Sequence, residues 1–214
     1  MAYLYIMYNL PHFKESDDRV VIDFVKQHPF AMLVGVDADH NPVATQVPVF
    51  IDEKEGKLFL IGHIQRKTDH HLALEQNKNV LVVFSGAHTY ISASWYENKK
   101  EASTWNYRAV HAKGILRFLG EVELLEVLKR TTLHFENNAN SPSLVEHIPQ
   151  DYVAKMMKAI VAFEVEVTTL NHVFKLSQNQ NETDYNSIVK ELKNQGGEAE
   201  VVAKLMEERK GKLF

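Results

Sequence analysis

The stretch PVATQVPVFIDEKEGKLFLIGH, residues 42–63, decides the expected fold. Alternate positions from Val43 to Ile51 carry β-branched side chains, which is the period of a strand with one buried face. The sequence Glu53-Lys54-Glu55-Gly56 is typical of a turn, and residues 57–63 form the next strand. Strands joined this closely pair antiparallel, so the stretch predicts a locally connected antiparallel sheet.

The flanking sequence supplies the other elements. Further strands are expected over residues 30–37, 80–84, 88–94, 107–119 and 159–168, and helices over residues 16–28, 67–77, 121–137, 150–158, 184–195 and 198–209. About six strands in short succession indicate an antiparallel barrel with appended helices, because closure removes exposed sheet edges. None of the nine glycines forms GxGxxG or GxxxxGK[ST], which disfavours a dinucleotide-binding parallel sheet and a P-loop. We expect a barrel domain over residues 1–180 and a helical appendage, packed on the barrel, over residues 181–214.

Composition narrows the function classes. The 214 residues include 24 Lys and Arg against 28 Asp and Glu, a net charge of −4, so no global basic field exists for nucleic-acid binding. The absence of cysteine excludes disulfides, thiolate zinc sites and iron–sulfur clusters. The apolar segment of residues 1–8 lacks a basic flank and is too short to span a membrane. We therefore expect a cytoplasmic protein with no membrane partner.

The stretch GHIQRKTDHHL, residues 62–72, places two adjacent cations between a strand end and a helix start. Backbone N–H groups and the positive end of a helix attract an anion, Arg66 can clamp two oxygens, and Lys67 adds a point charge. This combination is suited to a phosphate group. The alternative is that both side chains are simply solvated turn residues.

A second candidate region, residues 88–107, holds both tryptophans and three tyrosines. Trp95, Tyr96, Trp105 and Tyr107 offer flat apolar faces with polar tips, suited to stacking on a conjugated ring or to a subunit interface. Ordinary packing is the alternative. The segment KLSQNQ, residues 175–180, has amide and hydroxyl groups that can read a heterocycle edge or cap the following helix, and the sequence favours capping.

The eleven histidines invite a metal hypothesis, but the chain contains no HExxH and no HxH motif, and no carboxylate is placed to complete a site with His70 and His71. No metal site is predicted.

A set of short motifs, in order along nearly the whole chain, resembles the PaiB family. The motifs are HPFA (28–31), ATQVP (44–48), GH (62–63), YISASWY (90–96), TWNY (104–107), VHAKG (110–114) and KLSQN (175–179). Members of that family are described as FMN-binding negative transcriptional regulators and are similar to the split-barrel flavoproteins, which include pyridoxamine 5′-phosphate oxidase. The resemblance implies an FMN-binding split barrel that forms a homodimer with flavin at the subunit interface.

The resemblance also implies roles for particular residues. Arg66 and Lys67 would hold the flavin phosphate, and His63 would lie near the ribityl chain. Ala44, Thr45 and Gln46 would run along the flavin ring. Trp95, Trp105, Asn106 and Tyr107 would approach from a loop, which the other subunit can supply.

The expected function is therefore an FMN-binding homodimer with a PaiB-type regulatory role, through DNA or a protein partner. The competing class is an enzyme, either an FMN-dependent oxidoreductase or a haem-handling relative of the same fold, since a flavin carries its own redox chemistry. Lys204, Arg209, Lys210 and Lys212 make the last helix basic, but neighbouring glutamates offset them, so we expect no tight specific DNA binding by the dimer alone.

Overall fold

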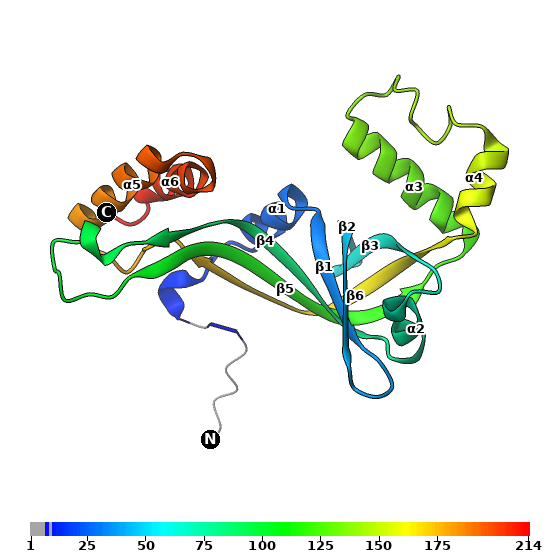
Figure 1. Cartoon of the computed structure of the whole chain (residues 1–214), viewed down its shortest axis with the longest axis horizontal. Helices are drawn as coiled ribbons and strands as arrows, with labels where there is room; N and C mark the ends of the chain where they lie inside the picture. The colour runs from blue at the N-terminus through cyan, green and yellow to red at the C-terminus, as the bar shows by residue number, and fades with distance from the viewer. Residues whose placement is uncertain (1–6, 9) are drawn as a thin grey trace. The chain divides into compact units, whose positions relative to one another are not determined.

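The computed structural model of the chain describes residues 7, 8 and 10–214, so most of the apolar segment 1–8 lies outside the described residues. Its centre is a six-stranded antiparallel sheet that closes into a barrel in the order β1-β2-β3-β6-β5-β4 (Figure 1). The strands are β1 (Phe30–Val36), β2 (Pro42–Lys54), β3 (Lys57–Gln65), β4 (Asn79–Ile91), β5 (Thr104–Phe118) and β6 (Ile160–Lys175). The expected fold class, a mainly β split barrel with appended helices, is confirmed.

The alternation expected from Val43 to Ile51 is present as far as Val49, but Phe50 and Ile51 are both buried. Val43, Val47 and Val49 of β2 are buried, while Ala44 and Gln46 between them are exposed. β2 pairs with β3 through Val49 and Gly62, and a Cβ atom at Gly62 would lie 2.8 Å from the carbonyl oxygen of Pro48. The close approach of these two strands therefore requires glycine immediately before His63.

Within residues 7, 8 and 10–214, six α-helices and two 3₁₀ turns accompany the strands. They are η1 (Pro11–Phe13), α1 (Asp18–Gln27), α2 (Asp69–Gln76), η2 (Ala93–Trp95), α3 (Glu121–Glu136), α4 (Gln150–Met157), α5 (Glu182–Gln195) and α6 (Gly197–Lys210). Gly196 and Gly197 have φ of +69° and +58°, a conformation that L side chains rarely adopt, and this is why α5 ends where α6 begins. Every helix predicted from the sequence is found, within two residues at most ends.

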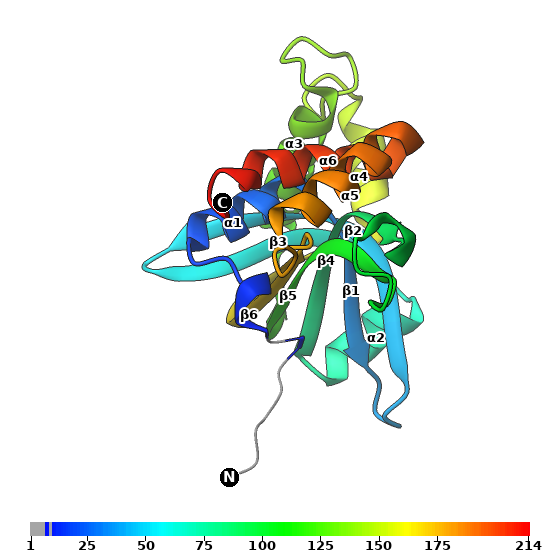
Figure 2. The same cartoon turned by 90° about the vertical axis from the view of Figure 1, so that its left-hand side faces the viewer.

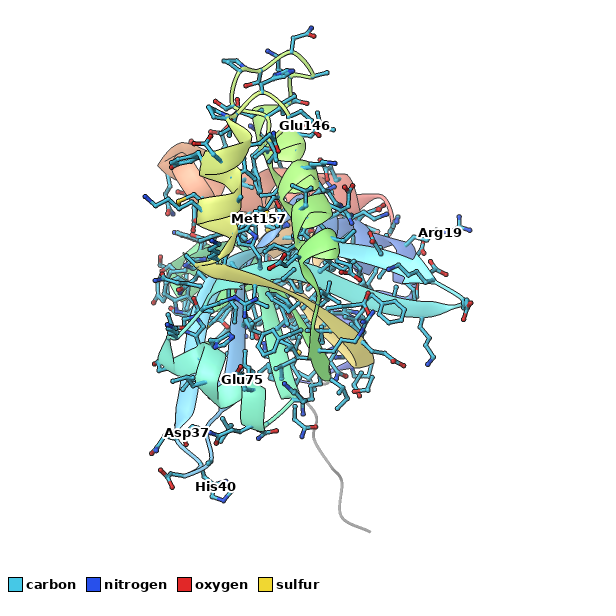
Figure 3. All side chains as sticks on the ribbon, turned by 90° about the vertical axis from the view of Figure 1, so that its right-hand side faces the viewer. Arg19, Asp37, His40, Glu75, Glu146 and Met157 are labelled. Atoms are coloured by element: carbon cyan, nitrogen blue, oxygen red, sulfur yellow. The ribbon has the colours of Figure 1, made fainter. Side chains whose placement is uncertain are left out.

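The chain divides into two compact units. The barrel unit comprises residues 24–84 and 111–170, and the hairpin unit comprises residues 1–23, 85–110 and 171–214. In the barrel unit, Leu124 and Val127 of α3 pack on Ile61 of β3 and Ala162 of β6, with Met157 of α4 against the same cluster (Figure 3). In the hairpin unit, α5 and α6 lie side by side around Tyr185, Ile188 and Val202 (Figure 2). The boundary at residue 180 stays a prediction.

Three details of the strand prediction were wrong, and one is that β6 continues to Lys175, beyond the expected end at residue 168. Residues 80–84 and 88–94 do not form separate strands, because Ser85-Gly86-Ala87 continues in extended conformation within β4. β5 begins at Thr104, so Trp105, Asn106 and Tyr107 lie on a strand and not on a loop. The residues between the strands, from Ser92 to Ser103, carry only Trp95 of the predicted ligand set.

Candidate functional site

The turn from β3 to α2 fixes the position of Arg66. Its backbone N–H donates to the carbonyl oxygen of Ala159 at 2.8 Å, and its Nε donates to the carbonyl oxygen of Ile160 at 2.8 Å. One hydrogen bond therefore holds the backbone of Arg66, next to the start of β6, and one holds its guanidinium group, at the first residue of β6. Its two terminal nitrogens carry four further N–H donors, in the planar arrangement that binds phosphate oxygens.

Lys67 follows in a left-handed backbone conformation with φ of +63°, and it is exposed. A lysine in this region is uncommon and costs free energy that the surrounding structure must compensate. The turn therefore places two consecutive cationic side chains, one fixed and one mobile in solvent, at the start of α2.

The first turn of α2 is capped by its own residues. Thr68 is the N-cap, and its Oγ1 accepts from the backbone N–H of His71 at 3.3 Å. The carboxylate of Asp69 accepts from the backbone N–H of His70 at 2.7 Å, which lowers the pKa of Asp69. This carboxylate partly neutralises the positive end of the helix, so attraction for an anion here depends mainly on the cationic side chains.

We call the β3–α2 turn with Arg66 and Lys67 the cationic turn. His71 and Lys78 lie beside it, and sequence reasoning missed both. His71 is 5% exposed, and its ring lies 5.1 Å from that of Phe118. Lys78 lies over the same Phe118 ring, with Nζ 4.7 Å from the ring centre. The spacing of His71 and Leu74 at i and i+3 could have placed these two on one face of the helix, but Lys78 lies beyond the end of α2 at Gln76, so helical spacing does not relate it to them.

His63 lies on β3 opposite Ala162 of β6 and is half-buried. Burial lowers its pKa, so the imidazole is neutral at pH 7. Its buried Nδ1 has no hydrogen-bond partner among the described residues. A buried nitrogen without a partner is costly, and a ligand hydroxyl would satisfy it.

The three predicted residues of β2 do not share one face. Ala44 and Gln46 are exposed and lie opposite Val34 and Met32 of β1. Thr45 lies opposite the buried Leu33, so its side chain lies on the other face of the sheet. Only its backbone can therefore contact a ligand that lies along Ala44 and Gln46.

In the hairpin unit, three side chains form an exposed cluster that we call the aromatic patch: His88, Tyr90 and Trp105. Trp105 is 51% exposed and Tyr90 48%, with their rings 5.9 Å apart, edge to face. The ring of His88 lies 6.1 Å from that of Trp105. A groove of about 320 Å³ adjoins the patch and is lined by Ser85, Gly86, His88, Trp105, Tyr107, Arg108 and Ala109.

Two other predicted residues, Asn106 and Trp95, make hydrogen bonds or packing contacts within the hairpin unit. Asn106 is fully buried, and its amide donates to Ser177 Oγ at 2.9 Å and accepts from the same hydroxyl at 3.1 Å. The half-buried Trp95 packs against the core around α5 and α6, and its carbonyl oxygen accepts from Ser187 Oγ at 2.8 Å. The sequence did not distinguish these structural positions from exposed ones.

The helix cap predicted within residues 175–180 lies one residue later. Asn181 is the N-cap of α5, and its side chain accepts from the backbone N–H of Asp184 at 2.9 Å.

A larger cavity of about 470 Å³ lies elsewhere in the barrel unit, between β2, β3, β5 and β6. Its charged walls are paired with each other, Lys54 and Arg117 with Glu164 and Lys57 with Glu166. Because these pairs neutralise the walls, we place the candidate site at the β3–α2 turn.

Comparison with known proteins identifies the family. Residues 7–169 match the family model described as "Putative FMN-binding domain". The chain belongs to this FMN-binding family. It is also 32% identical to Protease synthase and sporulation protein PAI 2 of Bacillus subtilis (strain 168). The alignment of 204 residues covers 95% of this chain and 98% of that protein. The PaiB resemblance is thereby confirmed.

Solved structures confirm the fold. The flavocytochrome Anf3 from Azotobacter vinelandii is similar with a TM-score of 0.53 and 16% identity, over 80% of this chain and 74% of that one. The FAD and heme binding protein from Mycobacterium smegmatis has a TM-score of 0.52 and 15% identity, over 75% of this chain and 72% of that one. At these identities the likeness concerns the split-barrel fold alone. In the described part of the chain, no helix is long and apolar enough to cross a membrane.

Proposed function

We propose that the protein is an FMN-binding homodimer of the PaiB type, with the flavin phosphate held at the β3–α2 turn. The observation that carries the proposal is the guanidinium of Arg66, which is held by a hydrogen bond from Nε to Ile160 at the start of β6, in a chain that belongs to an FMN-binding family. An immobilised guanidinium loses little conformational freedom when phosphate binds, which favours affinity.

Residues of the barrel unit suit both the phosphate and the ribityl chain of FMN. Arg66 and Lys67 offer charge-assisted donors for the phosphate, and the free Nδ1 of His63 offers a partner for a ribityl hydroxyl. Ala44 and Gln46 present a small side chain and an amide on the outer face of β2, suited to a planar ring edge. A bound flavin would supply redox chemistry, and these residues would bind and orient it.

The dimer is supported by an exposed apolar face of the barrel unit. On the outer face of β1, Phe30 is 66% exposed and Met32 is 39% exposed. Their cross-strand neighbours are Pro48 and Gln46 on β2, and Val83 on β4. Phe30 and Met32 are therefore exposed apolar side chains beside the half-buried Pro48 and Val83, and a second copy would bury them.

A titration of two flavins tests the phosphate assignment. The change Arg66→Ala should weaken FMN by tenfold or more, since a hydrogen bond to a charged group contributes about 1.5–3 kcal/mol. Riboflavin, which lacks the phosphate, should lose little. Arg19→Ala is the matched control, because Arg19 is an exposed arginine on α1 (Figure 3). Equal losses for the two flavins would mean that Arg66 supports the fold and not the phosphate.

Sedimentation tests the dimer. The wild-type protein should sediment as a dimer at micromolar concentration, and Phe30→Glu should shift it towards the monomer, because the substitution places a charge in an apolar contact. Val122→Glu is the control, since Val122 on α3 is equally apolar and 77% exposed. A wild-type monomer would overturn the dimer proposal.

The regulatory part of the proposal rests on similarity to the Bacillus subtilis protein. Three cations of the C-terminal helix are paired with acids, Lys204 with Glu200, Arg209 with Glu15 and Lys210 with Glu182, each at 3.0 Å. This pairing leaves little basic surface for DNA, so we propose an indirect, cytoplasmic role through a protein partner. Nanomolar sequence-selective DNA binding in a mobility-shift assay at physiological salt would contradict this part.

A further inference from the structure

His71 is an unsatisfied histidine beside the cationic turn. Its side chain is 6% exposed, and its Nδ1 has no hydrogen-bond partner within the described residues. Its Nε2 lies 3.9 Å from Glu75 Oε1, which is beyond hydrogen-bond distance. Buried imidazoles are normally held by at least one hydrogen bond, so this one calls for an explanation.

The charges around His71 are mostly positive. Arg66 from the β3–α2 turn, His70 from α2 and Lys78 from the start of β4 all disfavour a proton on His71, and Glu75 on α2 favours one. β5 contributes an apolar neighbour, the Phe118 ring, whose centre lies 5.1 Å from that of His71. Burial adds to the cationic neighbours and lowers the pKa of His71, so the ring is neutral while no anion is bound.

We propose that His71 takes up a proton when a phosphate ester binds at the β3–α2 turn, so that binding of the phosphorylated flavin is coupled to proton uptake. The inference rests on the proposed function. A dianionic phosphate on Arg66 would offset the positive field that keeps His71 neutral, and the protonated ring could then attract Glu75 and the phosphate together. His71 would be a positioning residue that does not itself bind the phosphate. It would affect phosphate binding through its electrostatic interaction with Arg66.

The sign of the pH dependence follows from linkage. Because the complex holds more protons than the free protein, FMN binds more weakly as pH rises through the range in which His71 titrates. Uptake of about half a proton corresponds to about a threefold rise in Kd per pH unit. Riboflavin carries no phosphate, so its affinity should not show this dependence.

Titration calorimetry in buffers with different ionisation enthalpies measures the protons directly. FMN is titrated at about pH 7, where a phosphate monoester with a second pKa of about 6 is mostly dianionic. The wild-type protein should take up a fraction of a proton per FMN, and His71→Gln should take up none. His40→Asn is the control, since it removes an exposed histidine from the β1–β2 turn, where Asn tolerates the φ of +65° (Figure 3).

A second variant covers the case in which His71→Gln fails to fold. Glu75→Gln changes a residue that is half exposed and removes the one acid that favours the protonated ring, so it should lower proton uptake while the protein stays folded. Uptake equal to that of the wild type in His71→Gln, or in Glu75→Gln if only this variant folds, would overturn the inference and leave the proposed function standing. Failure of the wild-type protein to bind FMN would overturn the proposed function itself.

Discussion

The β3–α2 turn of the barrel unit and the aromatic patch region of the hairpin unit both contain residue types suited to a flavin, but they differ in what those residues already contact. At the turn, the buried Nδ1 atoms of His63 and His71 have no hydrogen-bond partner in the described structure. Of the predicted ligand residues in the hairpin unit, Asn106 and the backbone of Trp95 are hydrogen-bonded to Ser177 and Ser187, while the buried Asn171 Nδ2, outside that set, has no partner within the described residues. Unused polar atoms in a folded chain indicate a ligand, whereas the same residue types with their partners present indicate structure.

The largest expected effect is on the stability of the hairpin unit, and it is tested at Asn106. The change Asn106→Ala should lower the free energy of unfolding by about 1–3 kcal/mol, because it leaves the buried hydroxyl of Ser177 without its partner. Urea unfolding measures this, with Asn98→Ala as an exposed control. If Asn106→Ala left stability intact and abolished FMN binding, Asn106 would belong to the ligand site and the contrast between the two regions would fail.

The two tryptophans should separate binding from stability. Trp105→Ala removes an exposed ring, so it should leave unfolding nearly unchanged and weaken FMN several-fold, as expected for an aromatic contact of about 0.5–1.5 kcal/mol. Trp95→Ala removes a ring that packs on the α5–α6 core, so it should mainly lower stability. Flavin titration and urea unfolding of both variants give the answer, and a reversed pattern would mean that the exposed ring is not a ligand contact.

The smallest effect concerns His172, the hydrogen-bonded counterpart of His71. Its Nε2 accepts from the backbone N–H of Glu15 at 2.7 Å, which requires a neutral ring, and burial is the main cause of its lowered pKa. The stabilisation should be present above the ordinary histidine pKa of about 6.5 and be lost as pH falls through the lower folded value. Relative to its intrinsic rate, hydrogen exchange at the Glu15 amide should therefore become faster in acid, a loss of protection that matches a bond of about 0.5–1.5 kcal/mol. Exchange that follows only its normal pH dependence would show that this contact contributes nothing.

Much of the fold was predictable because its strands carry a regular period. Val43 to Val49 alternates without interruption, and the turn at Glu53–Gly56 fixes the hairpin to β3. The continuity of β4 through Ser85-Gly86-Ala87 was not predictable, because small residues punctuate loops and extended strands alike.

The candidate site was predictable only in part. Arg66 and Lys67 were predictable because they are adjacent cationic residues before a helix. The hydrogen bond from Arg66 to Ile160 was not, because it joins residues 94 positions apart. The local sequence says nothing about such a contact. For the same reason, the sequence could not show the hydrogen bond between Asn106 and Ser177, 71 positions away, or that the Nδ1 of His71 has no partner among the described residues.

The most direct test of the central claim is an experimental structure of the protein with FMN bound. The account predicts the phosphate oxygens within hydrogen-bond distance of the terminal nitrogens of Arg66, at the start of α2, with the Nε contact to Ile160 retained. A phosphate bound away from the β3–α2 turn, with Arg66 still pointing only at the protein's own carbonyl oxygens, would contradict it.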